Sequence, residues 1–159
     1  FAFQSWNSLA LNLFSKDVII NPDPVYDWPA GVFVLKFFVF FGLISTLCFV
    51  IYKLRTHPNL AEYSIVFCSL FALAYSPASA SYHLLLMLFP VALLIKLQND
   101  NERFIAFLIC FLFLIGFSGI LFDFINSRIS FLPFRFYRLI LLNGFFVMTS
   151  MRIVKRFDA

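Results

Sequence analysis

Apolar residues fill long stretches of this chain, and short polar stretches separate them. The five apolar segments fall at about residues 30–52, 60–75, 81–97, 104–122 and 132–151. A helix of about 20 apolar residues matches the hydrocarbon thickness of a bilayer and satisfies its own backbone hydrogen bonds. The pattern therefore predicts an all-α fold: a polytopic membrane helical bundle with about five hydrophobic segments, spanning residues 30–159.

The first fifteen residues have a different, amphipathic pattern. Apolar and aromatic side chains recur at spacings of three and four, and polar side chains occupy the rest of the helical wheel. This predicts a helix too polar to span, lying in the interface with its aromatic face toward lipid or neighbouring helices. Three prolines within residues 21–29 predict a loop, whose Tyr26 and Trp28 suit an interfacial aromatic belt.

A polar, helix-breaking stretch at residues 76–83 separates two strongly apolar segments. It reads Ser-Pro-Ala-Ser-Ala-Ser-Tyr-His and carries four hydroxyls and an imidazole. Irregular backbone at membrane depth is tolerated where protein buries it or a water-filled cavity receives it. We therefore expect this stretch to form a binding wall. Because its flanking segments are short and Pro90 should kink the second, residues 60–97 form either two spans or a re-entrant pair of half-helices.

Composition and charge narrow the class of protein. Apolar residues make up 62% of the chain and charged residues 13%, which excludes a soluble domain. The net charge of +4 fits cytoplasmic loops and anionic lipid, and no basic-aromatic patch indicates a nucleic-acid partner. The three cysteines sit singly in apolar runs and the two histidines lie far apart, so we predict no metal and no cofactor. Since the chain opens on Phe1 without a leader, we expect a portion of a longer protein.

The distribution of cations predicts an orientation. One side of the bundle would hold seven Lys and Arg residues: Lys53, Arg55, Lys96, Arg103, Arg152, Lys155 and Arg156. The other side would hold four: Lys16, Arg128, Arg135 and Arg138. The positive-inside rule assigns the richer side to the cytoplasm of a plasma or inner membrane. Residues 1–29 and the polar stretch 76–83 then share the extracytoplasmic face.

Two segments resemble one known family. The segment Gln4-Ser5-Trp6-Asn7-Ser8-Leu9 is similar to the Gln-Ser-x-Asn stretch of glycosyltransferase family 87. The stretch at 76–83, followed by a leucine-rich run with Pro90, resembles that family's Ser-Pro-x-Ser-Trp-x-His-His junction. Here Ala80 and Tyr82 replace the family's Trp and first His, and His83 stays in register. Order and separation agree with the C-terminal half of that family, whose members are polyprenyl-phosphate-mannose-dependent membrane enzymes of GT-C type.

The resemblance implies an activity and its partners. The parent protein would be a hexosyltransferase that moves a sugar, expected to be mannose, from a polyprenyl-phosphate donor to a lipid or glycan acceptor on the extracytoplasmic face. In GT-C enzymes the catalytic aspartate lies in the first extracytoplasmic loop, which would precede Phe1. No catalytic residue is therefore assigned to this chain, and the chain alone should be inactive. Its role would be to bind the donor's lipid phosphate and sugar.

Each candidate binding residue has a simpler alternative role. The candidates are Ser76, Ser79, Ser81, Tyr82, His83, Arg128, Arg135, Arg138, Gln4, Ser5 and Asn7. His83 at a helix start can donate to a phosphate, or can be satisfied by a hydroxyl of its own loop. The three arginines suit a phosphate clamp, or snorkel to headgroups. The polar N-terminal residues contact the ligand, or form the wet face of an interfacial helix.

Two other functions remain open from the sequence. A transporter or lipid-carrier flippase would use the broken region 60–97 as a substrate site between half-helices. A structural membrane subunit would bind no ligand at all.

Overall fold

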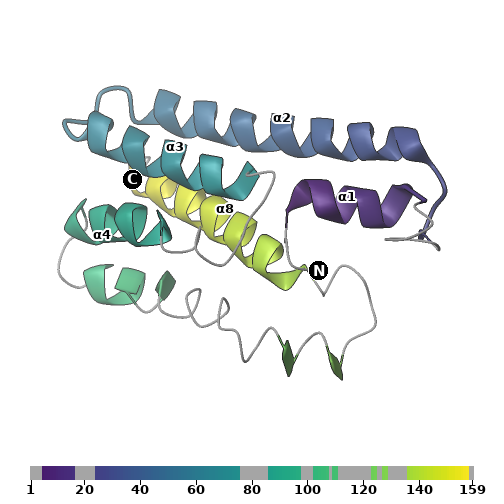
Figure 1. Ribbon diagram of the computed structural model, residues 1–159. Helices are drawn as coiled ribbons and strands as arrows, with labels where there is room; N and C mark the ends of the chain where they lie inside the picture. The colour runs from purple at the N-terminus through teal and green to yellow at the C-terminus, as the bar shows by residue number, and fades with distance from the viewer. Residues whose placement is uncertain are drawn as a thin grey trace.

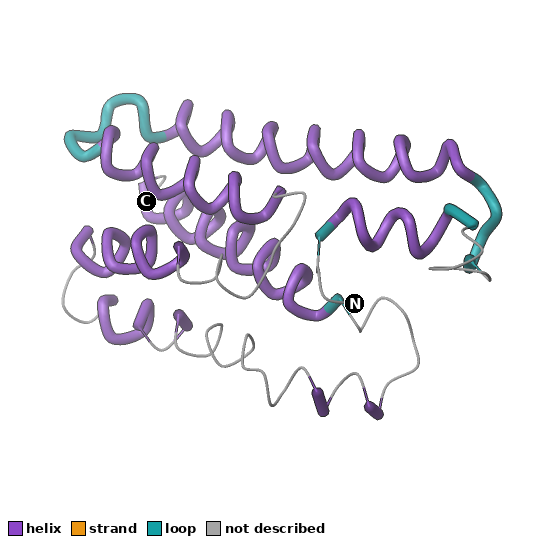
Figure 2. Tube along the Cα trace, in the orientation of Figure 1, coloured by secondary structure: helices purple, strands orange, loops and turns teal. Residues whose placement is uncertain are grey.

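All regular secondary structure in the described part of the chain is helical. The computed structural model describes residues 5–16, 24–75, 86–97, 102–107, 109–110, 123–124, 127–128 and 136–157. Its labelled helices are α1 (Trp6–Phe14), α2 (Pro29–Lys53), α3 (Leu60–Tyr75), α4 (Leu88–Leu97) and α8 (Tyr137–Phe157). Figure 1 shows α2 as the longest element, with the other helices gathered on one side of it, and Figure 2 marks the same helices in purple. The predicted all-α class is confirmed.

The predicted first span corresponds to α2 within one residue at each end. The helix begins at Pro29, whose missing N–H costs nothing in a first turn, and ends after 25 residues at Lys53. A tight turn then reverses the chain. His57 stabilises this turn: its backbone N–H donates to the Leu54 carbonyl at 2.8 Å, and its Nδ1 accepts from the Asn59 N–H at 3.1 Å. The reversal places α3 antiparallel to α2.

The main core lies between α2, α3 and α8. On α2 the buried residues follow spacings of three and four, which bring them onto one face. The fully buried members of α3 include Phe67, whose ring meets Phe146 of α8 edge-on at 6.2 Å. The buried residues of these three helices are Leu43, Leu47, Val50, Tyr63, Val66, Phe67, Leu70, Ala74, Leu142, Phe145, Phe146 and Ile153. α2, α3 and α8 are thereby fixed relative to one another.

Helix α1 packs along α2. At one end of α1, Asn7 contacts Lys36 of α2, and at the other end Phe14 packs against Gly31. The two helices therefore run side by side and antiparallel, as Figure 1 shows. Of the two predicted settings for the apolar face of α1, lipid and neighbouring helices, the structure shows the second, with Leu9 packed on Phe136 of the segment leading into α8. The placement of α1 in a membrane interface stays a prediction.

Helix α4 corrects the predicted effect of Pro90. The helix begins at Leu88 after a short 3-10 turn, so Pro90 lies in its first turn. A proline there removes no intrahelical hydrogen bond, because the first N–H groups of a helix have no partner within it. Pro90 therefore does not kink the described helix. The bundle face of α4 buries Val91 and Leu94 against the main core.

Helix α8 is the second long helix and runs in the same direction as α2. Its C-terminal half faces the C-terminal half of α2, so Lys155 and Lys53 lie at the same end of the bundle. Arg156 joins this end to Glu102 through an ion pair at 3.0 Å. α8 begins five residues later than the predicted segment and continues six residues further. Three cations of the predicted cytoplasmic set, Lys53, Lys155 and Arg156, therefore lie at the same end of the bundle.

Two helices, α2 and α8, are long and apolar enough to cross a membrane. α3 and α4, with 16 and 10 residues, are apolar but shorter. α2 also exposes large rings, including Phe33 at 76% and Phe38 at 68% of their surface. Soluble monomers rarely expose such contiguous apolar surface, whereas a lipid-facing helix does so at no cost. Most of the predicted fourth segment, residues 111–122, lies outside the described residues.

Candidate functional site

Several of the predicted binding residues lie outside the described part of the chain. These are Gln4, Ser76, Ser79, Ser81, Tyr82, His83 and Arg135. The described candidates are Ser5, Asn7, Arg128 and Arg138. Of these four, the structure brings Asn7 and Arg138 to the same end of the bundle.

The polar residues at the start of α1 have defined partners. Ser5 is fully buried, and its hydroxyl accepts a hydrogen bond from the Ser8 backbone N–H at 3.1 Å. This is an N-cap, which satisfies one of the free N–H groups of the first turn. Asn7, two residues on, accepts from the Nζ of Lys36 through its side-chain oxygen at 3.1 Å. Ser5 thus fixes the helix start, and Asn7 presents its amide to α2.

Lys36 is the most informative residue of this region. It lies seven residues after Pro29, about 10 Å along an apolar helix of about 37 Å. Its ammonium is partly buried and held by Asn7, and no carboxylate within the described ranges forms an ion pair with it. A cation inside an apolar segment is costly without a partner of opposite charge, and such residues mark ligand or ion sites.

Three helix ends meet at this turn of α2. Phe40, one helical turn after Lys36, packs its ring against Tyr75 at 5.1 Å, and Tyr75 is the last residue of α3. The start of α1 meets the same turn through Asn7. The start of α8 joins them because Leu139 packs against Leu9 of α1. The described residue that directly precedes the polar stretch 76–83 therefore lies near Lys36.

The two described arginine candidates have different settings. Arg138, in the first turn of α8, is partly buried, and its Nε lies 3.3 Å from the hydroxyl of Tyr137. Its guanidinium also lies 5.9 Å from the Tyr137 ring. Leu139, the next residue, contacts α1, so Arg138 lies at the same end as Lys36. Arg128 is exposed, and its predicted role in a phosphate clamp stays a prediction.

Two buried polar atoms at this end have no hydrogen-bond partner among the described residues. They are the indole Nε1 of Trp6, a donor, and the side-chain oxygen of Asn143, an acceptor. Trp6 packs on the Leu9, Phe136 and Leu139 cluster, and the Asn143 amide donates to the Leu139 carbonyl at 2.8 Å. An unpaired buried polar atom costs about 1–3 kcal/mol. A bound group with hydroxyl and oxygen atoms would remove both penalties.

We call the set Trp6, Asn7, Lys36, Arg138 and Asn143 the polar site. It holds two cations, one free donor atom and one free acceptor atom at the end of the bundle opposite Lys53 and Lys155. Among the described residues, no group of three or more His, Cys, Asp or Glu side chains comes together to hold a metal. The chemistry available to the polar site is therefore the binding of an anion and of hydroxyl-bearing groups.

Sequence reasoning found part of this set. Asn7 and Arg138 were predicted, whereas Lys36, Trp6 and Asn143 were missed. A lysine within an apolar run was the signal for Lys36. The roles of Trp6 and Asn143 had no local signal, because their unpaired atoms result from contacts between α1 and α8.

Comparisons of the chain with protein-family models, with curated proteins and with solved structures find no match. The resemblance to glycosyltransferase family 87 therefore stays a prediction from the residues that carry it.

Proposed function

We propose that this chain is a membrane-embedded part of a polyprenyl-phosphate-sugar-dependent glycosyltransferase, and that its polar site binds the donor's lipid phosphate on the extracytoplasmic face. The observation that carries the proposal is the Lys36 ammonium, partly buried in an apolar helix and held by the neutral amide of Asn7. A phosphate supplies the negative charge that this ammonium lacks. The apolar surface of α2 offers a polyprenyl chain a favourable environment away from water.

The remaining atoms of the polar site suit the rest of such a donor. Sugar hydroxyls both donate and accept, so they can pair with the Trp6 Nε1 and with the Asn143 oxygen. Arg138 adds a second, permanently charged cation at the start of α8, where the helix dipole also favours an anion. His83 and Tyr82 of the polar stretch follow Tyr75 by a few residues and remain proposed donor ligands.

In transfer from a lipid phosphate, these residues would stabilise the leaving group. The bond between the sugar and the phosphate oxygen breaks, and negative charge grows on the departing phosphate. Cations already aimed at that phosphate lower the barrier, because they gain strength as the charge develops. The general base that deprotonates the acceptor would come from another part of the parent protein, and mannose and inversion are the expected sugar and stereochemistry.

A binding experiment on the purified protein tests this proposal. Lys36→Gln keeps a polar side chain but removes the charge, so we expect the affinity for a polyprenyl phosphate to fall about tenfold or more. Lys16→Gln is the control, because Lys16 is an exposed cation beyond the opposite end of α1, away from Asn7. Equal affinities for the two variants would remove Lys36 from phosphate binding and overturn the proposal.

A second candidate, a lipid-carrier flippase or transporter, is favoured by one observation. α3 and α4 are about 24 and 15 Å long, both shorter than a hydrocarbon core of about 30 Å. Broken helices of this kind surround substrate sites in many transporters. The two functions give different products in proteoliposomes of the parent protein. A glycosyltransferase would form a glycosylated acceptor, whereas a flippase would only move the lipid carrier between leaflets.

A further inference from the structure

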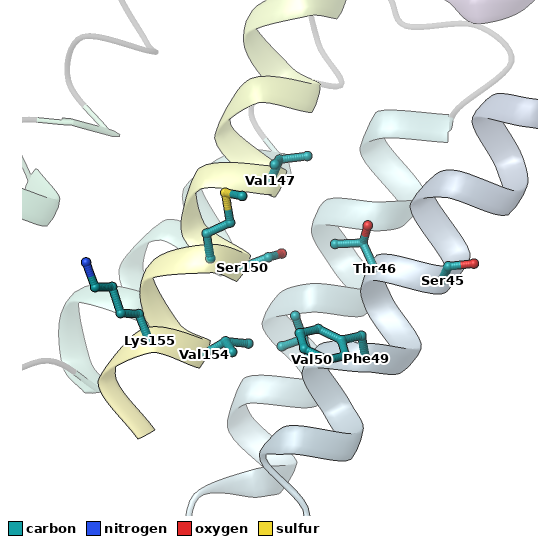
Figure 3. A pocket seen from close by; sticks show the side chains of 9 residues that line it. Ser45, Thr46, Phe49, Val50, Val147, Ser150, Val154 and Lys155 are labelled. Atoms are coloured by element: carbon teal, nitrogen blue, oxygen red, sulfur yellow. The ribbon is translucent and has the colours of Figure 1, made fainter. Parts of the chain in front are cut away.

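A groove lies at the end of the bundle opposite the polar site. It has a volume of about 640 Å³ and lies between the C-terminal halves of α2 and α8. Figure 3 shows Val147, Ser150 and Val154 of α8 pointing toward α2, with Thr46 and Val50 facing them. The groove exists because small and branched side chains face each other there. Its volume falls within the range of about 300–1,000 Å³ typical of ligand pockets.

Two of the three hydroxyl groups that line the groove already have acceptors, and the third, that of Ser45, points away from α8 (Figure 3). Thr46 donates to the Gly42 carbonyl at 2.8 Å, and Ser150 donates to the Phe146 carbonyl at 2.7 Å. Both bonds lie within the hydroxyl's own helix, one turn back. Neither donor is left for a polar ligand, and the rest of the wall is largely apolar, with Phe49 and Met151 exposed at its edges. Such a surface suits a hydrocarbon chain.

Cations flank the end of this groove. Lys155 lines it from α8, and its side chain extends away from α2 (Figure 3). On the α2 side, the Nζ of Lys53 lies 5.9 Å from the ring of Phe49, a groove residue. These lysines come from both walls, at the end where hydrocarbon would give way to headgroups. The arrangement is complementary to an amphiphile with an apolar chain and an anionic head.

We propose that the groove between α2 and α8 is a binding site for an anionic phospholipid of the bilayer, with one acyl chain along the groove and its phosphate near Lys53 and Lys155. This site is separate from the polar site and does not depend on glycosyl transfer. It requires only that α2 and α8 lie in the bilayer. The lipid fills the space between the two long helices and stabilises their contact.

Native mass spectrometry of the purified protein, delipidated and then titrated, tests the proposal. The probes are phosphatidylglycerol and phosphatidylcholine with identical acyl chains. We expect phosphatidylglycerol to bind more tightly. Lys155→Gln should reduce that preference about fivefold, since each cation near an anionic headgroup contributes about 1 kcal/mol. Lys96→Gln, which removes an exposed cation from α4 outside the groove, should leave the preference unchanged.

A groove-filling pair of variants tests the place of the acyl chain. Val147→Phe puts a ring into the groove and should weaken both lipids, whereas Ile140→Phe, about two turns earlier on α8 and outside the groove, should weaken neither. Equal binding of the two lipids to the unmodified protein would overturn the proposal. So would an unchanged preference in Lys155→Gln, a surface variant that leaves the core intact. Equal lipid retention by Val147→Phe and Ile140→Phe would exclude the groove as the site.

Discussion

The lysines at the two ends of the α2 and α8 pair differ in burial and in their partners. At the end near α1, Lys36 lies within the apolar length of α2 and takes a neutral amide as its partner. At the other end, Lys53 and Lys155 sit at the rim of the groove, where their ammonium groups are exposed. In the groove, the hydroxyls of Thr46 and Ser150 donate within their own helices, whereas the polar site leaves a donor and an acceptor unpaired.

This difference separates a specific site from a general one. Rim lysines interact with any anionic headgroup, because they reach solvent and adapt to the ligand. A cation held inside the bundle, with fixed neighbours, constrains both the charge and the position of what it binds. Under the two proposals, a particular lipid phosphate binds at the α1 end, and anionic lipids of the bilayer in general bind at the groove end.

The largest expected effect comes from a substitution at Gly31, where the missing side chain lets α1 pack closely against α2. A Cβ there would lie 2.7 Å from the Trp28 ring and 2.8 Å from the Phe14 ring. Gly31→Leu should therefore push α1 away from α2 and destabilise the protein by at least about 1–3 kcal/mol. Thermal unfolding in detergent measures this. Gly42→Leu is the control, because open space surrounds Gly42 on the same helix. Equal melting temperatures would show that α1 is not packed as described.

Asn7→Asp tests whether the polar site binds an anion, because it places a negative charge beside Lys36. A carboxylate at this position would pair with the Lys36 ammonium and occupy the place proposed for the phosphate. We expect the affinity for a polyprenyl phosphate to fall about tenfold, while the melting temperature stays the same or rises. Titration of the purified variant with the lipid, together with a melting curve, separates these effects. An affinity equal to that of the unmodified protein would mean that the phosphate binds elsewhere.

Removing the unpaired indole donor should have a smaller effect on affinity, and one that differs between the glycosylated lipid and the bare lipid phosphate. Trp6→Phe keeps an aromatic ring on the Leu9 cluster but removes the buried Nε1 donor. If a sugar hydroxyl accepts from this donor, affinity for the glycosylated lipid should fall about fivefold, while affinity for the bare lipid phosphate stays unchanged. Trp28→Phe, at an exposed ring, is the control. A fall for both lipids alike would place the effect in packing and not in sugar recognition.

The smallest effect is expected at the groove end. Glu102 and Arg156 form an ion pair at 3.0 Å, but about a third of each side chain is exposed. Exposed pairs contribute about 0–1 kcal/mol, so Glu102→Gln should lower the melting temperature only slightly. Raising the salt concentration should reduce the difference further, because screening weakens the pair in the unmodified protein. A large loss of stability would mean that this end holds the bundle together more than the polar end does.

The sequence was sufficient for the elements whose pattern is local. The apolar run ending at Lys53 predicted α2 within one residue at each end, and the spacing of Trp6, Leu13 and Phe14 predicted α1. The end of α8 was placed too early, because Arg152, Lys155 and Arg156 looked like a tail. Cations are favourable in a last helical turn, and their long stems pack along the helix, so the helix continues through them.

What the sequence could not supply depends on contacts between distant residues. Lys36 and Asn7 are 29 positions apart, and nothing local indicates that an amide would hold the ammonium. The partner of the aromatic face of α1 was left open for the same reason. That face fits lipid as well as it fits protein, and only the packing of Leu9 on Phe136 decides between them. The resemblance pointed to Asn7 and the distribution of cations pointed to Arg138, but neither could show that α1 and α8 bring them to one end.

The central proposal is that the polar site, and not the groove, binds the phosphate of the polyprenyl donor. Cross-linking with a polyprenyl phosphate that carries a photoreactive group beside the phosphate tests it most directly, with the labelled residues identified by peptide mass spectrometry. We predict labels at Trp6 or Asn7 of α1 and between Arg138 and Asn143 of α8. Labels confined to the groove, between Ser45 and Val50 or between Val147 and Lys155, would contradict it.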